Sequence, residues 1–507
     1  MKIAVVGCVH GKLDKVYSKI RYLSKKNNYH IDLVIICGDF QTVRNRSDLD
    51  SLCVKPKFKL MHDFHRYYSG EKTAPFLTIF VGGNHEASNY LQELNFGGWV
   101  APNIYYLGRS GVINFNGLKI AGLSGIFKGY HLNLPYEEKY PYSNEEIRSI
   151  FHVRSLDIFR LHLIQRNIDI MITHDWPRGV TDHGDVNSLL KKKPFFRKDI
   201  ETTGLGSPIN WELLIKKQPR YYFCAHLHCK FTALIFHNNN NNFNNNYNNQ
   251  QKQQNYQQQN YQQQNYQQQN YQQQNYQQQN YQQQNYQQQK QQQNYNQQKS
   301  TQTQFLALDK PLPGRNFVEI MDIRINKDKE LEFKEKKIAN GKLYYDLEWL
   351  AILKVTQELF SKENRLKSVQ NLLFEKNNFI EKVNNEMKEM KNDKHYNDLQ
   401  IPENFQPSAP TLKEEISLKG QNFIPKVLEN QQHLRFVNWL GITDPWEGLG
   451  GSNQVENSEE IRIDLNSLEN NLSTQTSQQI IEEEEEEIPI VAKNPDEIDL
   501  DMDFDFD

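Results

Sequence analysis

Short apolar runs recur along the first 236 residues, and each is followed by turn-forming or polar residues. Five of them read, in chain order, KIAVVG, DLVIICG, FLTIFVGG, IDIMIT and YYFCA. Continuous apolar runs of this length are typical of strands buried on both faces. After the first run, Leu13, Val16, Ile20 and Leu23 recur at helical spacing. The alternation predicts a layered α/β domain with mixed strand directions over residues 1–236.

Weaker patterns predict further elements. We expect helices around residues 57–68 and over 144–166. Apolar runs at 103–107, 112–115 and 118–123 predict a β-meander, in which Asn116-Gly117 favours a tight hairpin turn. Strands expected at 220–225 and 231–236 flank His226 and His228. Alternation along an extended stretch would turn both imidazoles to the same side.

The composition changes after residue 236. Residues 237–301 contain an Asn-rich run and seven tandem Asn-Tyr-Gln-Gln-Gln units that start at Asn255. A period of five fits neither helix nor strand, and too few apolar residues are present to offset the entropy of ordering, so we expect a disordered insertion. A self-associating segment is the alternative. Residues 302–450 predict a smaller C-terminal domain, helical from near Leu347, and residues 451–507 predict a disordered acidic tail.

Charge and cysteine content narrow the class of protein. Residues 1–236 hold 32 Lys and Arg against 21 Asp and Glu, a net charge of +11, which suits a polyanionic substrate. An ordinary solvated surface is the alternative. The five cysteines are odd in number and give no disulfide framework, and no apolar stretch is long enough to span a bilayer. We therefore expect a soluble protein of a reducing compartment, without a signal peptide or a membrane partner.

Polar side chains that can bind metal follow all five strand-like runs. Because the carboxyl ends of strands form the ligand crevice of an α/β sheet, these residues are expected to meet there. They are Cys8, His10, Asp39, Asn84, His85, His174, His226 and His228. Any one of them has a duller explanation, such as a surface histidine, a helix cap at Asp39 or a core thiol at Cys8. Their joint occurrence favours a metal site.

This set of residues suits hydrolysis of a phosphodiester by two metal ions. Such a reaction needs a cation pair to stabilise charge and activate water, and a carboxylate to bridge the pair. Asp39 is the natural bridge, and neutral imidazoles with one amide complete the ligands. His85 directly follows the candidate ligand Asn84, so it is expected to face the substrate and to act as the general acid.

The order of these segments resembles the calcineurin-like metallophosphoesterase family. Two positions depart from its pattern, because Cys8 stands where the family has its first Asp, and Ala225 where Gly is usual. The segment Gly7-Cys8-Val9-His10-Gly11 is the form found in RNA lariat debranching enzymes, and this chain is similar to them. Further matches are Thr173-His174-Asp175-Trp176-Pro177, Phe305-Leu306-Ala307-Leu308-Asp309-Lys310 and Tyr345-Asp346-Leu347-Glu348-Trp349-Leu350. The resemblance implies a layered β-sandwich core flanked by helices.

The resemblance also implies an activity and a ligand set. The activity is hydrolysis of the 2′–5′ phosphodiester at the branch point of excised intron lariat RNA. One metal ion would bind Cys8, His10, Asp39 and His228, and the other would bind Asp39, Asn84, His174 and His226. A thiolate in place of a carboxylate moves the preference toward Zn(II) or Fe(II), with Mn(II) able to substitute.

A recognition segment over residues 124–154 is a further implication. Its tyrosines and cations suit stacking and phosphate contacts with single-stranded RNA, although tyrosines that pack on the domain are the alternative. The candidate substrate-binding residues are Lys128, Tyr130, Tyr136, Tyr140, Tyr142 and Arg148. Nuclear location and partners from spliceosome release or RNA turnover are likewise implied. The competing hypotheses are another metallophosphoesterase, acting as a nuclease, phosphodiesterase or protein phosphatase, and a non-catalytic RNA-processing scaffold.

Overall fold

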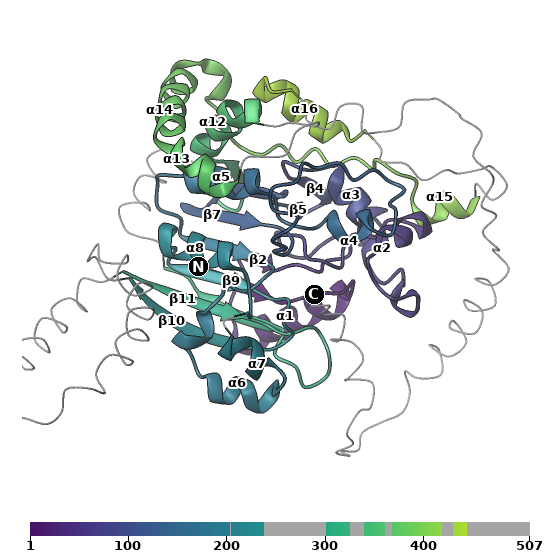
Figure 1. Cartoon of the computed structure of the whole chain (residues 1–507). Coiled ribbons are helices and arrows are strands. Elements are labelled where there is room, and N and C mark those ends of the chain that lie inside the picture. The colour runs from purple at the N-terminus through teal and green to yellow at the C-terminus, as the bar shows by residue number, and fades with distance from the viewer. Residues whose placement is uncertain (203, 238–300, 325–338, 360–367, 418–428, 444–507) are drawn as a thin grey trace, which may run out of the picture. The chain divides into compact units, whose positions relative to one another are not determined.

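The computed structural model describes residues 1–202, 204–237, 301–324, 339–359, 368–417 and 429–443 (Figure 1). The expected disordered insertion, apart from its two end residues, and the acidic tail lie outside these ranges. Within the described residues, no helix combines the length and the apolar character needed to cross a bilayer.

The first of two mixed β-sheets has six strands in the order β12-β1-β2-β3-β5-β4. Its four central strands are parallel, while β4 and β12 run antiparallel to their neighbours. The bounds are β1 Lys2–Val6, β2 Leu33–Ile36, β3 Thr78–Phe80, β4 Gly98–Ala101, β5 Ile104–Tyr106 and β12 Val318–Asp322. The apolar runs at 2–6, 33–36 and 78–80 thus form neighbouring strands, as their patterns predict.

The second sheet has seven strands in the order β10-β11-β9-β8-β7-β6-β13. Strands β7, β8, β9 and β11 are parallel to one another, and the others are antiparallel to their neighbours. The bounds are β6 Ser110–Phe115, β7 Leu118–Leu123, β8 Ile170–Thr173, β9 Tyr221–Cys224, β10 Phe231–His237, β11 Thr301–Ala307 and β13 Leu343–Tyr345.

The two sheets pack face to face. Buried side chains from both sheets, such as Ile35 of β2 and Ile172 of β8, belong to one core cluster. Helices α1 and α2 cover the outer face of the first sheet, and α5, α8 and α12 cover that of the second (Figure 1). The layered β-sandwich flanked by helices is therefore confirmed.

Most helices before residue 237 are short. Their bounds are α1 Leu13–Asn27, α2 Phe64–Tyr68, α3 Ser88–Gln92, α4 Glu146–Ser149, α5 Ser155–Leu163, α6 Val186–Lys192, α7 Phe196–Glu201 and α8 Pro208–Lys217, with 3-10 turns η1 Arg46–Ser51, η2 Pro56–Phe58 and η3 Val180–His183. The helix predicted from Leu13 is confirmed. The continuous helix predicted over 144–166 is wrong, because Ile126 forms a bridge with His152 that separates α4 from α5. Likewise, the stretch around 57–68 is divided between η2 and α2.

The predicted meander is also wrong in its pairing. Its three strands exist, and the hairpin turn at Asn116-Gly117 is confirmed by positive φ at both residues. However, β5 belongs to the first sheet, whereas β6 and β7 belong to the second. Gly108, with φ of 84°, lies between them, where the chain passes from one sheet to the other.

The C-terminal region begins with strands and continues with helices. Strands β11, β12 and β13 complete the two sheets, so residues on both sides of the repeat build the sandwich. The helical pattern predicted from Leu347 is confirmed by α12 Leu347–Thr356, α13 Val369–Phe374, α14 Lys376–Asn392, α15 Leu412–Ser417 and α16 Gln431–Leu440, with η5 Gln357–Leu359 and η6 Lys394–Tyr396. The buried Lys119 of β7 contacts Asp346 and Glu348, both at 3.0 Å, and fastens this region to the second sheet. A domain boundary at residue 302 stays a prediction.

Candidate metal centre

The loops that follow five strands bring polar side chains together at one rim of the sandwich. Cys8 and His10 follow β1, Asp39 follows β2, Asn84 and His85 follow β3, His174 follows β8, and His226 and His228 follow β9. These strands are parallel within their sheets, so their carboxyl ends reach the same edge. The predicted convergence of these residues is what the structure shows.

Four of the eight residues form one compact group. Ligand atoms of Cys8, His10, Asp39 and His228 all lie within 4.8 Å of one another. The Nε2 atoms of His10 and His228 are 3.0 Å apart, and His10 Nε2 is 3.5 Å from Asp39 Oδ2. Two imidazole nitrogens facing each other beside a carboxylate and a thiol are a donor set for a transition metal.

A second group meets the other oxygen of the same aspartate. His174 Nε2 lies 3.3 Å from Asp39 Oδ1 and 3.1 Å from Asn84 Oδ1. The ring of His226 is 5.0 Å from that of His174, centroid to centroid. Asp39 therefore stands between the two groups with one carboxylate oxygen toward each, the position that a bridging ligand requires.

The backbone at this rim is held in an unusual conformation. His10, Asp39, His226 and His228 have φ between 47° and 62°, in the left-handed region that non-glycine residues rarely adopt. Each such residue costs about 1 kcal/mol or more and persists only where surrounding structure enforces it. The predicted extended alternation at His226-Leu227-His228 is thus wrong. Left-handed turns, rather than strand pleating, place both imidazoles at the rim, with Leu227 buried between them.

Two glycines allow the close approach of these groups. A Cβ on Gly38 would lie 2.2 Å from His174 Nδ1, and a Cβ on Gly83 would lie 2.2 Å from Asp39 Oδ1. Gly38 also has φ of 115°, a conformation that other residues avoid. Any side chain at either position would displace Asp39 or His174.

Burial and charge set the protonation of the centre. Burial alone would raise the pKa of Asp39, but the imidazoles of His174, His85 and His10 hold it well below its ordinary range. Burial lowers the pKa of His10 and His226 well below that of free histidine, so both are neutral, as metal ligation requires. Burial, followed by the charge of Asp39, raises the pKa of the Cys8 thiol well above its usual value.

One buried atom shows that the residues fit a cation. Among the described residues, Asp39 Oδ2 is buried and has no hydrogen-bond partner, which is a costly arrangement for a carboxylate oxygen. It faces the same group as the Cys8 thiol, whose ionisation needs nearby positive charge. A divalent cation among these atoms would satisfy both needs.

Surrounding hydrogen bonds fix the candidate ligands. The carbonyl of Cys37 accepts a hydrogen bond from His174 Nδ1 at 2.8 Å, which leaves Nε2 as the ligating atom. The Glu86 carboxylate accepts N–H bonds from Phe40 and Gln41, both at 2.7 Å, and from Gly83 at 2.9 Å. Our sequence reasoning assigned no role to Glu86, although its place directly after Asn84-His85 was the available signal. Burial, with the charge of Asp39, raises the pKa of Glu86 to about 8.

His85 lies beside the centre rather than inside it. Its backbone N–H donates to Asp39 Oδ1 at 3.0 Å, and its ring is 5.8 Å from that of His10. The carbonyl of Cys53 accepts a hydrogen bond from His85 Nδ1 at 3.0 Å, and His85 Nε2 lies 3.1 Å from Asn84 Nδ2. His85 Nε2 therefore lies beside the candidate ligand Asn84, where an acid for a leaving oxygen belongs.

The candidate substrate-binding residues of the recognition segment differ in how exposed their side chains are. Lys128 is half-buried, and Tyr130 and Arg148 are exposed. Tyr136 and Tyr140 are buried, so their predicted stacking on RNA is wrong. The hydroxyl of Tyr136 donates to Asp157, its ring lies 3.6 Å from the guanidinium of Arg109, and the Tyr140 hydroxyl donates to the Ser47 carbonyl. Packing on the domain, the alternative left open by the sequence, describes these two side chains.

Tyr142 is intermediate, because it is half-buried and its hydroxyl donates to Gln92 Oε1 at 2.8 Å.

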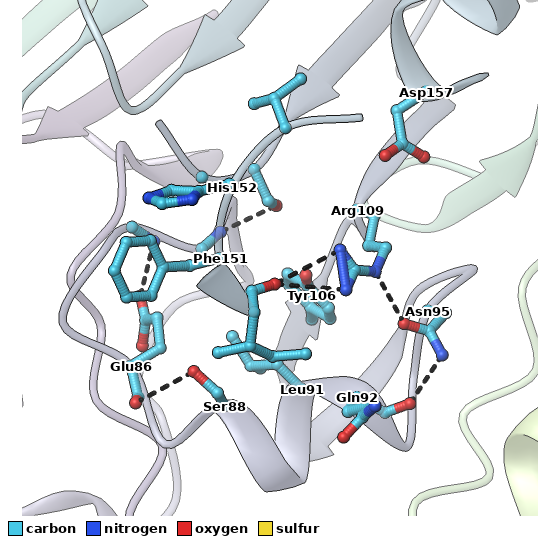
Figure 2. Close-up of a pocket in the computed structure, with 16 residues that line it drawn as sticks. Glu86, Ser88, Leu91, Gln92, Asn95, Tyr106, Arg109, Phe151, His152 and Asp157 are labelled. Carbon is cyan, nitrogen blue, oxygen red and sulfur yellow. Dashed lines mark hydrogen bonds between the residues drawn. The ribbon is translucent and has the colours of Figure 1, made fainter. Parts of the chain in front are cut away.

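A pocket lies behind the loop that carries Asn84 and His85. Figure 2 shows Arg109 on one side, with hydrogen bonds to Asn95 Oδ1 and to the Ile150 carbonyl. Glu86 lies on the opposite side of the pocket from Arg109 (Figure 2), and Gly82 and Gly83 also line it. The Gly82 N–H donates to Ser124 Oγ at 2.9 Å, so a hydrogen bond links the recognition segment to the loop that carries Asn84 and His85.

Comparison with known proteins places this geometry in a family. Residues 1–230 match the model of the calcineurin-like phosphoesterases, and residues 299–445 match that of the lariat debranching enzyme C-terminal domain. The chain is 45% identical over 452 residues to a lariat debranching enzyme of Drosophila melanogaster, covering 88% of this chain and 78% of that protein. The chain belongs to the lariat debranching enzyme family.

Vertebrate members of the family are also similar. Lariat debranching enzyme A of Xenopus laevis is 39% identical over 444 residues, which cover 88% of this chain and 71% of that protein. The lariat debranching enzyme of Homo sapiens is 38% identical over 445 residues, with 88% and 70% coverage. The similarity therefore extends over both the sandwich and the C-terminal helices.

Proposed function

We propose that this protein is a metal-dependent hydrolase of the 2′–5′ phosphodiester at the branch point of excised intron lariat RNA. The products are a linear RNA with a 5′-phosphate and a free 2′-hydroxyl. The observation that carries the proposal is the group of Cys8, His10, Asp39 and His228, whose ligand atoms lie within 4.8 Å. The match to family models on both sides of the repeat supports the choice of substrate.

Asp39 and His85 have different roles in the proposed reaction. Bound cations supply charge stabilisation and a water of lowered pKa. Asp39, with one oxygen toward each group, holds the two sites at a fixed separation. His85, whose Nδ1 proton is held by the Cys53 carbonyl, would deliver a proton to the departing 2′-oxygen when Nε2 is protonated as well, and would be left as the neutral imidazole.

The identity of the metals follows from the ligand types. One site offers the thiol of Cys8 and the other the amide oxygen of Asn84, so the two sites differ in softness. We propose Zn(II) or Fe(II) as the native ions, with Mn(II) able to support activity. The deeply buried thiol favours ions that bind thiolate strongly, because only such an ion offsets the cost of ionising it.

RNA is proposed to approach across the recognition segment. Lys128, Tyr130 and Arg148 retain accessible side chains there, and the net charge of +11 over residues 1–236 favours a polyanion. Because intron lariats arise in the nucleus, we propose that the protein acts there, with factors of spliceosome release or RNA turnover as partners.

A comparison of three substrates tests the proposal. The purified full-length protein, loaded in turn with Fe(II), Zn(II) and Mn(II), is given a branched 2′–5′ oligonucleotide, a linear 3′–5′ RNA and a phosphopeptide. We expect cleavage of the branch alone, with a free 2′-hydroxyl. Preferential cleavage of either control would favour a different phosphoesterase activity, and hydrolysis of none would favour a scaffold.

A further inference from the structure

A segment near the end of the described chain is bound to the loop that follows Asp39. We call residues 405–417 the C-terminal strap and residues 41–54 the bridge loop. The carboxylate of Glu415 in the strap accepts hydrogen bonds from the backbone N–H of Arg46 at 2.9 Å and of Ser47 at 3.0 Å, and from the Ser47 hydroxyl at 2.7 Å. These N–H groups begin η1, where they have no partner within the turn. The single carboxylate of Glu415 thus satisfies the backbone N–H groups of both Arg46 and Ser47.

A buried ion-pair network makes a second connection between strap and bridge loop. Arg44 is almost fully buried and pairs with Asp48 and Glu93, each at 2.8 Å. Its Nη1 also donates to the Ser408 hydroxyl of the strap at 3.0 Å, and that hydroxyl donates to Glu93 at 2.6 Å. Buried charges of this kind hold one geometry, because separating them leaves a desolvated charge unpaired.

The bridge loop in turn reaches His85. Its Cys53 carbonyl accepts the hydrogen bond from His85 Nδ1 at 3.0 Å. Val43 and Leu52 of the bridge loop form a small apolar cluster with Ala87, two residues beyond His85. The contacts therefore run without a break from the strap, through the bridge loop, to the nitrogen that sets the tautomer of His85.

The recognition segment is attached to the same place. The Tyr140 hydroxyl donates to the carbonyl of Ser47 at 2.8 Å, and Ser47 is the residue that Glu415 holds from the other side. A displacement of η1 would thus move Tyr140 as well as Cys53.

We propose that Glu415 is a positioning residue for His85, acting through the bridge loop. This inference rests on the proposed function, in which His85 protonates the leaving 2′-oxygen. A displaced Cys53 carbonyl would leave the imidazole free to turn or to change tautomer, so proton delivery would suffer. Metal binding should be unaffected, since Glu86 fixes the backbone beside Asp39 and Asn84, and the Cys37 carbonyl fixes the His174 ring.

The test uses two phosphodiesters that differ in their need for an acid. The 2′-oxygen of branched RNA leaves as a poor leaving group, whereas bis(4-nitrophenyl) phosphate releases a stable phenolate without protonation. In the full-length protein Glu415→Gln keeps the shape of the side chain but turns one acceptor into a donor that faces an N–H. Glu414→Gln is the matched control, because Glu414 contacts only Thr411 of the strap among the described residues.

We expect Glu415→Gln to lower kcat on branched RNA about 10-fold, a part of the 100-fold or more that a general acid contributes. Its kcat on bis(4-nitrophenyl) phosphate should change less than about twofold, with metal content equal to that of the parent. Equal losses on both substrates, or loss of metal, would overturn the inference in favour of a general role in folding. Unchanged kcat on both would overturn it as well.

A second measurement separates this inference from the proposed function. The imidazole nitrogen chemical shifts of His85 report the Nδ1 hydrogen bond whatever the substrate. They should differ between Glu415→Gln and the parent but not between Glu414→Gln and the parent. A parent that does not cleave branched RNA would refute the proposed function alone, whereas unchanged His85 shifts in Glu415→Gln would refute the positioning role alone.

Discussion

His237 and Thr301 are paired residues on the antiparallel strands β10 and β11, although residues 238–300 separate them in the sequence. The full register of this pair, from Phe231 with Ala307 to His237 with Thr301, consists of residues outside the repeat. The sandwich therefore needs only a connection across one end of a hairpin, which a short turn can supply.

Replacement of residues 238–300 by an Asn-Gly turn should leave kcat on branched RNA within about twofold of the parent. Closing a far shorter loop costs less entropy, so the free energy of unfolding should rise by roughly 3 kcal/mol. Urea unfolding and the branched-RNA assay check both expectations. A soluble variant with activity reduced more than 10-fold would show that the repeat contributes to catalysis.

Substitution of the bridging carboxylate should abolish activity and metal binding together. Asp39→Asn keeps the shape of the side chain but removes the negative charge that lies between the two groups. We expect kcat to fall at least 1,000-fold and metal content to fall below two ions per chain. The exposed Asp182 provides the control, since Asp182→Asn should change neither the metal analysis nor the rate.

Replacement of the thiol should change the preferred metal rather than destroy the site. Cys8→Asp returns a hard oxygen ligand, so activity with Mn(II) should persist while the advantage of Zn(II) or Fe(II) is lost. Rates with each ion, measured on metal-stripped and reloaded protein, give the comparison. Cys229→Ala removes a buried thiol that is not one of the four grouped residues and should retain the metal preference of the parent. An unaltered order of metals in Cys8→Asp would contradict a ligand role for the thiol.

The position of the candidate metal centre could be predicted from the sequence, because each strand end is marked by an apolar run followed by polar residues. Apolar runs identified the central strands, and the polar residues that follow them converge as predicted. The conformation of those residues was not predictable by alternation, since His226 and His228 are held at positive φ by tertiary contacts.

Contacts between residues distant in sequence could not be predicted from the sequence either. The contacts of Glu415 with Ser47 and of Arg44 with Ser408 join residues more than 360 positions apart. No local pattern reports such pairs. Burial of Tyr136 has the same origin, because the residues that enclose it, Arg109 and Asp157, come from other elements. Residue type alone could not separate a tyrosine that faces RNA from one that packs inside.

The difference between two tyrosines of the recognition segment gives a prediction on RNA binding. Tyr130 is 63% exposed, whereas Tyr136 is 3% exposed. Loss of one stacking ring costs about 1–3 kcal/mol, so Tyr130→Ala should raise KM for branched RNA roughly 10-fold with little change in unfolding. Tyr136→Ala should instead destabilise the fold by about 3 kcal/mol or more, since it leaves a cavity and removes the hydroxyl that donates to the buried Asp157 Oδ2. KM and urea unfolding, measured for both variants, separate the two roles.

A histidine pair in the same segment, with His152 buried and His131 half-buried, predicts how stability depends on pH. His131 Nδ1 and His152 Nδ1 are 2.6 Å apart, so one ring donates to the other as long as at least one of the two is neutral at this nitrogen. Burial, with the neighbouring His131 and Arg154, lowers the pKa of His152 to about 2. In the unfolded chain the pKa is about 6.5. Between these values the unfolded state binds more protons, so this contribution to stability is complete above pH 6.5 and declines as the pH falls.

The slope supplied by one such group approaches 1.4 kcal/mol per pH unit. His152→Asn should therefore reduce the loss of stability between pH 7 and pH 5, relative to the parent. Urea midpoints measured across this range on the same preparation provide the test, with His30→Asn at an exposed position as the control. A pH dependence equally steep in His152→Asn and the parent would contradict the assignment, because the neutral form of His152 would then contribute nothing to the fold.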